Sequence, residues 1–127
     1  MIVYKPIDIE DECRVALKDY MTAYVRPLPK DFETPSILIS QTGGSTSDTI
    51  DSFTVTIQSR SRRQAEAVDI LNNAIAILEQ VAKNQTTKLR YVTVNSMGSW
   101  GVDPVRPDLS LCSATMLCYC HREKVEV

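Results

Sequence analysis

The sequence predicts a single α+β domain, residues 1–127, in which helices pack mainly on one face of a largely antiparallel or mixed sheet. Three observations lead to this fold class. The length of 127 residues fits one domain, and the hydrophobic fraction of 43% is that of an ordinary globular protein. Two segments repeat apolar residues with a helical period, and four others are typical of short strands. Their order is helix, strand, strand, helix, strand, strand.

The first helix is expected over residues 8–24. Asp8 is a suitable N-cap because its carboxylate can accept a hydrogen bond from a free backbone N–H, and acidic residues follow in the first turn. The segment 26–35, RPLPKDFETP, contains three prolines and predicts an extended connector that ends the helix. The apolar stripe of this helix comprises Ile9, Cys13, Ala16, Leu17, Tyr20, Met21 and Tyr24.

Two strands are expected next, at residues 36–40 and 51–60. The first, SILIS, is short, apolar and rich in β-branched residues. In the second, apolar and polar residues alternate, which is typical of a half-buried strand with one side facing water or a partner. The polar side comprises Thr54, Thr56 and Gln58.

The stretch between these strands, TGGSTSDTID at residues 42–51, is polar and prone to turns. It lacks the Gly-Lys-Ser/Thr end of a phosphate-binding loop and does not lead directly into a helix, so we expect a long, flexible connection. Asp48 is expected to be solvated and not to hold a cation. We expect residues 42–50 to be weakly ordered in the free protein and ordered at a subunit or partner contact, with Gly43 and Gly44 supplying backbone freedom.

The second helix is expected over residues 61–83. Ser61 and Gln64 have the spacing of a capping box, in which each side chain satisfies a free backbone N–H. The apolar surface of this helix covers about half of its circumference, which is more than packing on one sheet requires. The extra flank contains Ile70 and Ile77, and we expect it to contact either the first helix or a neighbouring subunit.

The last two strands are expected at residues 88–97 and 110–122. On one face of the fourth strand the residues are apolar and mostly small, which suits close packing under a helix: Cys112, Ala114, Met116, Cys118 and Cys120. An irregular loop, GSWGVDPVRPD, is expected between the two strands and contains Asp103 and the only tryptophan, Trp100. Two roles for Trp100 are open, namely an anchor at an interface or a cover over the protein's own core.

The motif content favours no enzyme class, so we expect no catalytic site, cofactor or metal. His121 is the only histidine, and no Gly-x-Ser-x-Gly element is present. The four cysteines contain no Cys-x-x-Cys pair and are expected to be reduced and packed as small apolar residues. A metal site built from Cys118, Cys120 and His121 is the minor alternative.

Charge and hydropathy narrow the partners further. The net charge of −2 gives no global field that would attract nucleic acid. No apolar run approaches the roughly 18 residues needed to cross a bilayer, so no membrane is expected as a partner. The first residues have no signal-peptide pattern, which predicts a protein made in the cytoplasm.

A local basic cluster, Arg60, Arg62 and Arg63, stands at the start of the second helix. Arginines beside a helix N-terminus make a natural anion site. Three interpretations are open: a solvated face, an acidic partner such as a carboxylate of a neighbouring subunit, or nucleic-acid phosphate. No aromatic residues are interleaved with these arginines, which weighs against nucleic acid.

Taken in order, these features resemble the tail terminator, or tail completion, proteins of long-tailed bacteriophages. The matching segments are VRPLPKDFETP after the first helix, then SILIS, QTGG and IDSFTVTIQSRS, then RRQAEAVDILNNAIAIL, and VDPVRPD before the last strand. An aspartate closes the Gly-Gly loop before the alternating strand. The resemblance covers most of the chain, from about residue 8 to residue 122.

The resemblance implies a non-enzymatic virion protein, made in the host cytoplasm and located at the head-proximal end of the tail. Such proteins form a ring, usually a hexamer, that stops polymerisation of the tail tube and offers an attachment surface to the head connector. The implied partners are further copies of the chain, the major tail tube protein and a head-completion or connector protein, with DNA only passing through the channel. A free monomer before assembly is compatible with this role.

Because the family shares no site residues that can be carried over by role, the expected interface residues come from the features above. They are Gly43, Gly44, Asp48, Arg60, Arg62, Arg63, Ile70, Ile77, Trp100 and Asp103. Two alternative functions remain: another head–tail connector or tail-assembly factor of similar fold, and a small nucleic-acid-binding domain that uses the basic cluster.

Overall fold

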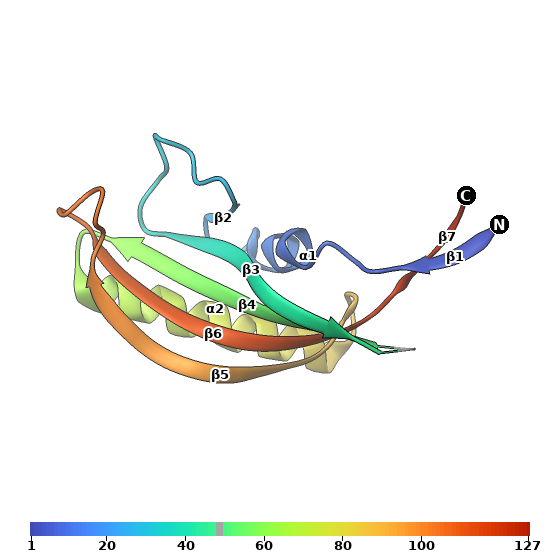
Figure 1. Ribbon diagram of the computed structural model, residues 1–127. Helices are drawn as coiled ribbons and strands as arrows, with labels where there is room; N and C mark the ends of the chain where they lie inside the picture. Colours follow the sequence, from blue (N-terminus) through green and yellow to red (C-terminus); the bar gives the residue numbers. More distant parts are fainter. Residues whose placement is uncertain (48–49) are drawn as a thin grey trace.

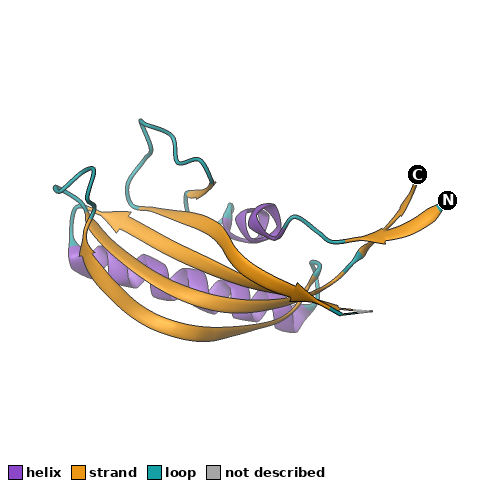
Figure 2. Cartoon of the chain, viewed as in Figure 1, coloured by secondary structure: helices purple, strands orange, loops and turns teal. Residues whose placement is uncertain are grey.

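The computed structural model describes residues 1–47 and 50–127, which form two helices and seven strands in one small α+β domain (Figure 1, Figure 2). Five strands form a mixed sheet in the order β2-β3-β4-β6-β5, in which β2 is parallel to β3 and the other neighbours are antiparallel. The predicted fold class is confirmed. The elements are β1 (Ile2–Lys5), α1 (Ile9–Leu17), β2 (Ala23–Val25), β3 (Ser36–Thr46), β4 (Ile50–Ser61), α2 (Gln64–Asn84), β5 (Leu89–Val102), β6 (Ser110–His121) and β7 (Glu123–Glu126).

The core lies between one face of the sheet and the two helices. Residues alternate between buried and half-exposed along β4 and β6, and directly paired residues such as Ile57 and Ala114 point to the same face. The five apolar residues predicted to share one face of β6 are all buried. Helix α2 lies across β4, β6 and β5 on this face, while α1 packs against α2 and β3. The opposite face carries half-buried side chains and no helix within the described ranges.

Helix α1 begins as predicted but ends earlier. The Asp8 side chain caps it by accepting a hydrogen bond from a backbone N–H of the first turn at 3.2 Å. The helix ends at Leu17, whose carbonyl accepts hydrogen bonds from the N–H groups of Tyr20 and Met21 in a final turn. The predicted continuation to residue 24 was wrong because β2 pairs in parallel with β3. This tertiary pairing outweighs the helical period of the local sequence.

The polar stretch after SILIS is mostly strand and not a long connection. Strand β3 continues to Thr46 and pairs with β4 down to Asp51. A register shift between Gln41 and Gly43 marks a β-bulge, which bends the strand locally. Asp48, one of the expected interface residues, lies outside the described residues. A change of order in this stretch on assembly stays a prediction.

The Gly-Gly pair has a steric role that the sequence did not reveal. A Cβ atom at Gly44 would lie 2.8 Å from the backbone oxygen of Ser52, which is closer than real Cβ contacts. A Cβ atom at Gly43 would lie 3.6 Å from Thr54, an ordinary contact. Neither glycine has a left-handed φ. The expected backbone freedom is therefore corrected to a close approach of two strands at Gly44 alone.

Helix α2 begins at Gln64 and not at Ser61. Ser61 belongs to β4, where its hydroxyl donates to the Glu66 carboxylate and accepts a hydrogen bond from the Arg63 N–H at 3.3 Å. Arg63 is the N-cap, and its own side chain makes no capping hydrogen bond. The predicted capping box was wrong because pairing with Ser110 of β6 holds Ser61 in the sheet.

Strand β5 extends through a segment that was expected to be an irregular loop. Trp100 therefore lies in a strand, and the connection to β6 is limited to residues 103–109. Three register shifts against β6 bend the strand, which curves along the edge of the sheet in Figure 1. The strands β1 and β7 were not predicted either. They form an antiparallel ribbon that projects from the end of the sheet (Figure 1).

We expect Gly44→Ala to lower the free energy of unfolding by about 1–3 kcal/mol, because the new methyl group would press on a backbone oxygen that cannot rotate away. Gly43→Ala is the matched control, since its methyl group would make only ordinary contacts, and we expect a change within about 0.5 kcal/mol. Urea unfolding of both variants measures the difference. Equal destabilisation by the two substitutions would contradict the steric role of Gly44.

Candidate assembly interface

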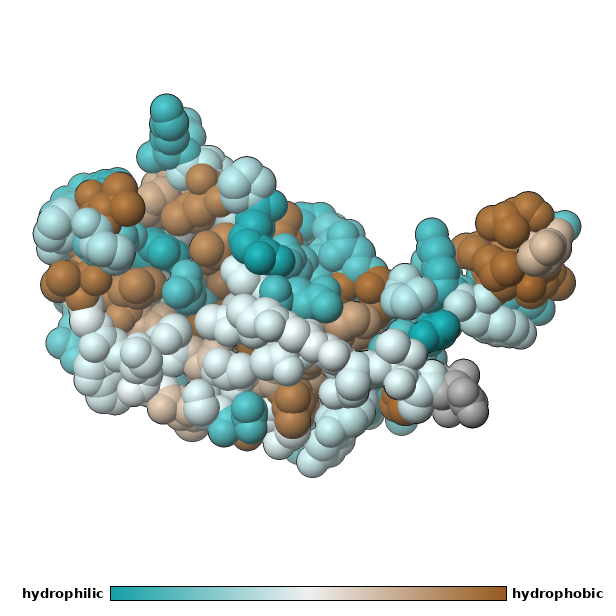
Figure 3. Space-filling view, viewed as in Figure 1, coloured by the Kyte–Doolittle hydropathy of each residue, from teal (hydrophilic) through white to brown (hydrophobic). Residues whose placement is uncertain are grey.

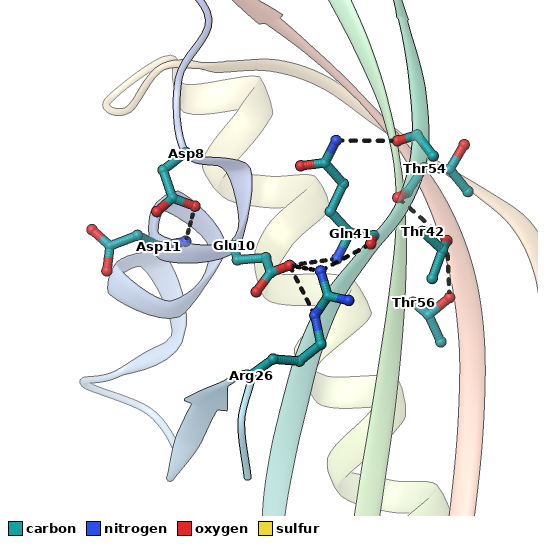
Figure 4. A network of polar contacts seen from close by, with 9 residues as sticks. Asp8, Glu10, Asp11, Arg26, Gln41, Thr42, Thr54 and Thr56 are labelled. Atoms are coloured by element: carbon teal, nitrogen blue, oxygen red, sulfur yellow. Dashed lines mark hydrogen bonds and ion pairs between the residues drawn. The ribbon is translucent and has the colours of Figure 1, made fainter.

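The two edges of the five-stranded sheet differ in how their backbone groups are satisfied. At one edge, β2 is only three residues long. Beyond it, side chains instead of a strand make hydrogen bonds with the backbone of β3. The Gln41 N–H donates to the Glu10 carboxylate at 2.9 Å, and Arg26 donates to the Gln41 carbonyl at 3.2 Å (Figure 4). Arg26 also pairs with Glu10. These contacts occupy backbone groups of β3 that another chain would need for strand pairing.

The ionisation of Glu10 supports this arrangement. Burial by itself would raise the pKa of Glu10, but hydrogen bonds from Arg26 and from the Gln41 N–H, together with the Arg26 charge, hold this pKa below its ordinary value of 4.5. An ionised carboxylate accepts stronger hydrogen bonds than a neutral one. Glu10 therefore connects three parts of the chain at one point, namely helix α1, the segment that follows β2, and strand β3.

The other edge is β5, which has no strand on its outer side among the described residues. It is 14 residues long, and three large apolar side chains of its second half, Met97, Trp100 and Val102, are each more than half exposed. Proteins usually shorten, charge or cover a strand edge of this kind. We call residues 97–102 of β5 the open edge, and their exposed apolar side chains make it a candidate surface for pairing with another chain.

Trp100 is held outward by the strand. Gly98 has a φ of +80°, in the left-handed region that favours glycine, next to a register shift between Met97 and Ser99. A Cβ atom there would lie 3.5 Å from the Trp100 ring, so the indole lies along the Gly98 backbone. Trp100 is 57% exposed and does not cover the core. Its role as an interface anchor stays a prediction.

Two expected interface residues, Arg60 and Asp103, form a buried ion pair with each other. The Arg60 Nε atom lies 2.7 Å from Asp103 Oδ2, and both side chains are nearly buried. The guanidinium groups of Arg60 and Arg106 lie 5.9 Å and 5.6 Å from the ring centroid of Phe32. Phe32 belongs to the proline-rich connector, so these contacts fix the connector beside the loop after β5. A pocket of about 290 Å³ opens between them.

The carboxylate of Asp103 is stabilised in its ionised form. Burial by itself would raise the pKa of Asp103, but hydrogen bonds from Arg60 and from the backbone N–H groups of Val105 and Arg106 hold it below the ordinary value of 3.8. The Val105 N–H donates to Asp103 Oδ1 at 2.9 Å. The carboxylate thus shapes the loop 103–109 and joins it to β4.

The other two arginines of the basic cluster are exposed. Arg62 lies 3.7 Å from Asp108, and Arg63 lies 3.4 Å from Glu66. Exposed ion pairs of this kind contribute little, so both arginines remain able to meet a carboxylate of another molecule. Because Arg60 is buried, the three arginines do not share one anion-binding surface. This arrangement weighs against the nucleic-acid interpretation.

The remaining expected residues are less prominent. Ile70 and Ile77 are half buried against the core, and α2 also contacts α1, so only part of each isoleucine is left for a subunit contact. Gly43 and Gly44 border a second pocket of about 330 Å³ near the end of the β3–β4 hairpin. Whether these positions meet another subunit stays a prediction.

The cysteines are packed in the core. All four are buried and free. Burial raises the pKa of Cys112, and it raises the pKa of Cys120 to about 12, so these two stay in the thiol form. Within the described ranges, no group of three or more His, Cys, Asp or Glu residues is placed to hold a metal ion.

Several important residues were not singled out from the sequence. Phe32 gave a signal, since a lone aromatic residue in a proline-rich, charged connector suggests a contact with the body of the domain. The apolar segment before Pro6 gave another, because β-branched and aromatic residues there favour a strand. The contact between Glu10 and Arg26 has no signal in the sequence, since it depends on where the proline-rich connector crosses the sheet.

No family model matches this chain, and a search of curated proteins found no match. In the ranges that the structure describes, neither helix is long and apolar enough to span a membrane. What the chain does is therefore inferred from its fold and its surfaces.

We expect Asp103→Asn to lower the free energy of unfolding at pH 7 by about 3 kcal/mol, because the Arg60 charge would remain buried without its partner. Asp108→Asn, which alters the exposed pairs, should cost less than about 1 kcal/mol. Because the folded pKa of Asp103 is lowered, its contribution is complete above 3.8 and is lost as the pH falls through the folded pKa.

The difference between wild type and Asp103→Asn should therefore shrink in acid, which urea unfolding from pH 7 to pH 2.5 measures. A difference that stays constant across this range would contradict the proposed ionic contribution.

Proposed function

We propose that this chain is a phage virion assembly protein that forms a ring at the head-proximal end of the tail tube. The ring would stop polymerisation of the tube and provide the attachment surface for the head connector. The observation that carries this proposal is the open edge of β5, an unpaired strand edge with large apolar side chains exposed. The resemblance in the order of the sequence segments supplies the class of assembly.

Self-association fits the asymmetry of the sheet. The β3 edge is occupied at Gln41 by Glu10 and Arg26, whereas residues 97–102 of β5 have neither an outer strand nor such a side-chain contact in the described part of the chain. Two edges of unlike character favour a directed contact between them and other surfaces over growth through identical edges. Such a contact suits a subunit that must be added in a fixed orientation.

The face of the sheet without helices fits a surface that lines a channel or meets a neighbour. Thr54, Thr56 and Gln58 are half buried, uncharged and aligned along β4. Uncharged hydroxyl and amide groups would not hold the phosphates of passing DNA, which charged arginines would do. Arg60, on the same strand, is neutralised by Asp103.

Another connector or tail-assembly role remains the alternative within the same class. The neighbouring genes discriminate between them, since a gene for the major tail tube protein immediately downstream favours the terminator. A nucleic-acid-binding role has no comparable support, because all three arginines of the basic cluster lie beside carboxylates of the same chain.

We expect the purified protein to cap one end of isolated tail tubes and to form closed rings there in electron micrographs. Trp100→Asp should abolish capping, because it places a charge on the open edge. Tyr20→Asp is the matched control, since Tyr20 is 68% exposed and lies outside the open edge, and it should cap as wild type does. Absence of both oligomers and tube binding in the wild type, across a wide concentration range, would remove the proposal.

A further inference from the structure

We propose that the ribbon of β1 and β7, here called the arm, docks on the open edge of the next copy of the chain, so that subunits join head to tail. This inference rests on the proposed function, because it names the two surfaces that would form the ring contact. The occupant of the open edge is thus a second copy of this chain and not a different protein. The argument uses the arm, the open edge and the distance between them.

The arm is a structure that needs a partner. Its two strands pair with each other, with Val3 opposite Val125, and neither has extensive contact with another described element. Ile2 and Tyr4 lie on the same side of β1 and are more than half exposed. A two-stranded ribbon alone is marginally stable in water. An apolar surface and a third strand would stabilise it.

The open edge supplies both of these. Met97, Trp100 and Val102 offer apolar contacts, and the free side of β5 offers N–H and C=O groups for strand pairing. Figure 3 shows hydrophobic residues gathered on the arm at one end of the molecule and again at the opposite end. The open edge runs toward that opposite end, because Val102 pairs with Ser110 at the end of β6 that lies away from His121.

The arm cannot reach the open edge of its own chain. It leaves the sheet just after His121, whereas Val102 pairs with Ser110 at the other end of β6. Even the near end of the open edge, where Met97 pairs with Ala114, lies seven residues or about 23 Å along β6 from His121, whereas four residues of strand span only about 13 Å. The arm also points away from the sheet (Figure 1). A contact between the two apolar regions must therefore join different molecules.

The charges on the arm are mixed, with exposed Lys5 and Lys124 near the exposed Glu126, so any charge pairing is local to single residues. Glu126 is exposed on the arm, opposite Ile2. The row of paired residues that contains Val102 ends at Ser61 of β4, and the exposed Arg62 and Arg63 follow directly. A docked arm would bring Glu126 toward these arginines. Glu126 would then share Arg62 and Arg63 with Asp108 and Glu66 of their own chain, as an acidic partner from a neighbouring subunit.

A contact between two different surfaces is heterologous, and repeated heterologous contacts close into a ring when the rotation between subunits allows it. An edge-to-edge contact between two copies of β5 would be isologous and would stop at a dimer. The arm and the open edge therefore account for a ring of more than two subunits, which paired open edges do not.

The test mixes two defective variants. The arm variant is Ile2→Asp with Tyr4→Asp, and the edge variant is Trp100→Asp with Val102→Asp. Each alone should associate at least about 30-fold more weakly than wild type, since each removes central apolar contacts. Mixed one to one, they should form a dimer that grows no further, because only one intact pair of surfaces exists. Native mass spectrometry and sedimentation velocity measure the species, with Tyr20→Asp as the control.

A second measurement uses rings on tail tubes, where unfolding of the arm cannot mimic the result. Tyr4→Cys combined with Val102→Cys should give covalent multimers on oxidation, while either single cysteine should give none. Covalent dimers from Val102→Cys alone would overturn the proposal in favour of an edge-to-edge contact. Normal rings from the arm variant would overturn it and leave the proposed function standing. Wild-type protein that neither associates nor caps tubes would remove both.

Discussion

The pairing of β4 with β6 is the constraint on which the rest of the structure depends. Twelve consecutive pairs, from Ile50 with His121 to Ser61 with Ser110, keep one register without a bulge. Because side chains alternate, a slip by one residue would move the buried residues of a strand to the face of the sheet that has no helices. The register therefore fixes the face on which α2 packs, and with it the positions of both sheet edges. It also places Arg60 on the face without helices, where Asp103 and the proline-rich connector (residues 26–35) enclose it.

From this central pair the two sides of the sheet develop differently. On the β3 side, pairing with β2 ends at Ile39, and Glu10 and Arg26 occupy the backbone groups of Gln41, whereas pairing with β4 continues past the bulge to Thr46. On the β5 side, the register shifts bend a long strand without covering it. Both sides contain bulges, so irregularity alone does not decide which edge is open. The difference lies in the charged side chains of Glu10 and Arg26, which occupy the backbone groups of Gln41 on one edge, whereas residues 97–102 on the other edge have no such contact in the described part of the chain.

The parts of the fold that the sequence predicted are those whose local pattern agrees with their tertiary role. β4, β6 and most of α2 have strong periodicity, and the same periodicity buries them. The residues after Leu17 keep a helical pattern, yet parallel pairing with β3 makes part of them a strand. The arm and the continuation of β5 were missed because four-residue strands and a Gly-rich segment carry weak local signals. Of the candidate interface, Trp100 was found by residue type, but the partnership of Arg60 with Asp103 depends on how a distant loop returns to β4.

Whether a head-to-tail contact closes a ring or extends a filament depends on the rotation that the arm sets between neighbouring subunits. Arg122, between β6 and β7, lies 3.2 Å from the buried Asp51 of β4 and donates to Thr46 Oγ1 at 2.7 Å. Lys88 lies 3.2 Å from Glu123, which links the base of the arm to the turn before β5. These contacts come from two sides of the sheet, so the arm leaves the domain in a defined direction. A defined direction sets one rotation between neighbouring subunits, and the contact closes into a ring where that repeated rotation returns to the first subunit. In the proposed ring, the two ion pairs at the base of the arm would help to set this rotation, although they lie outside the contact that joins the subunits.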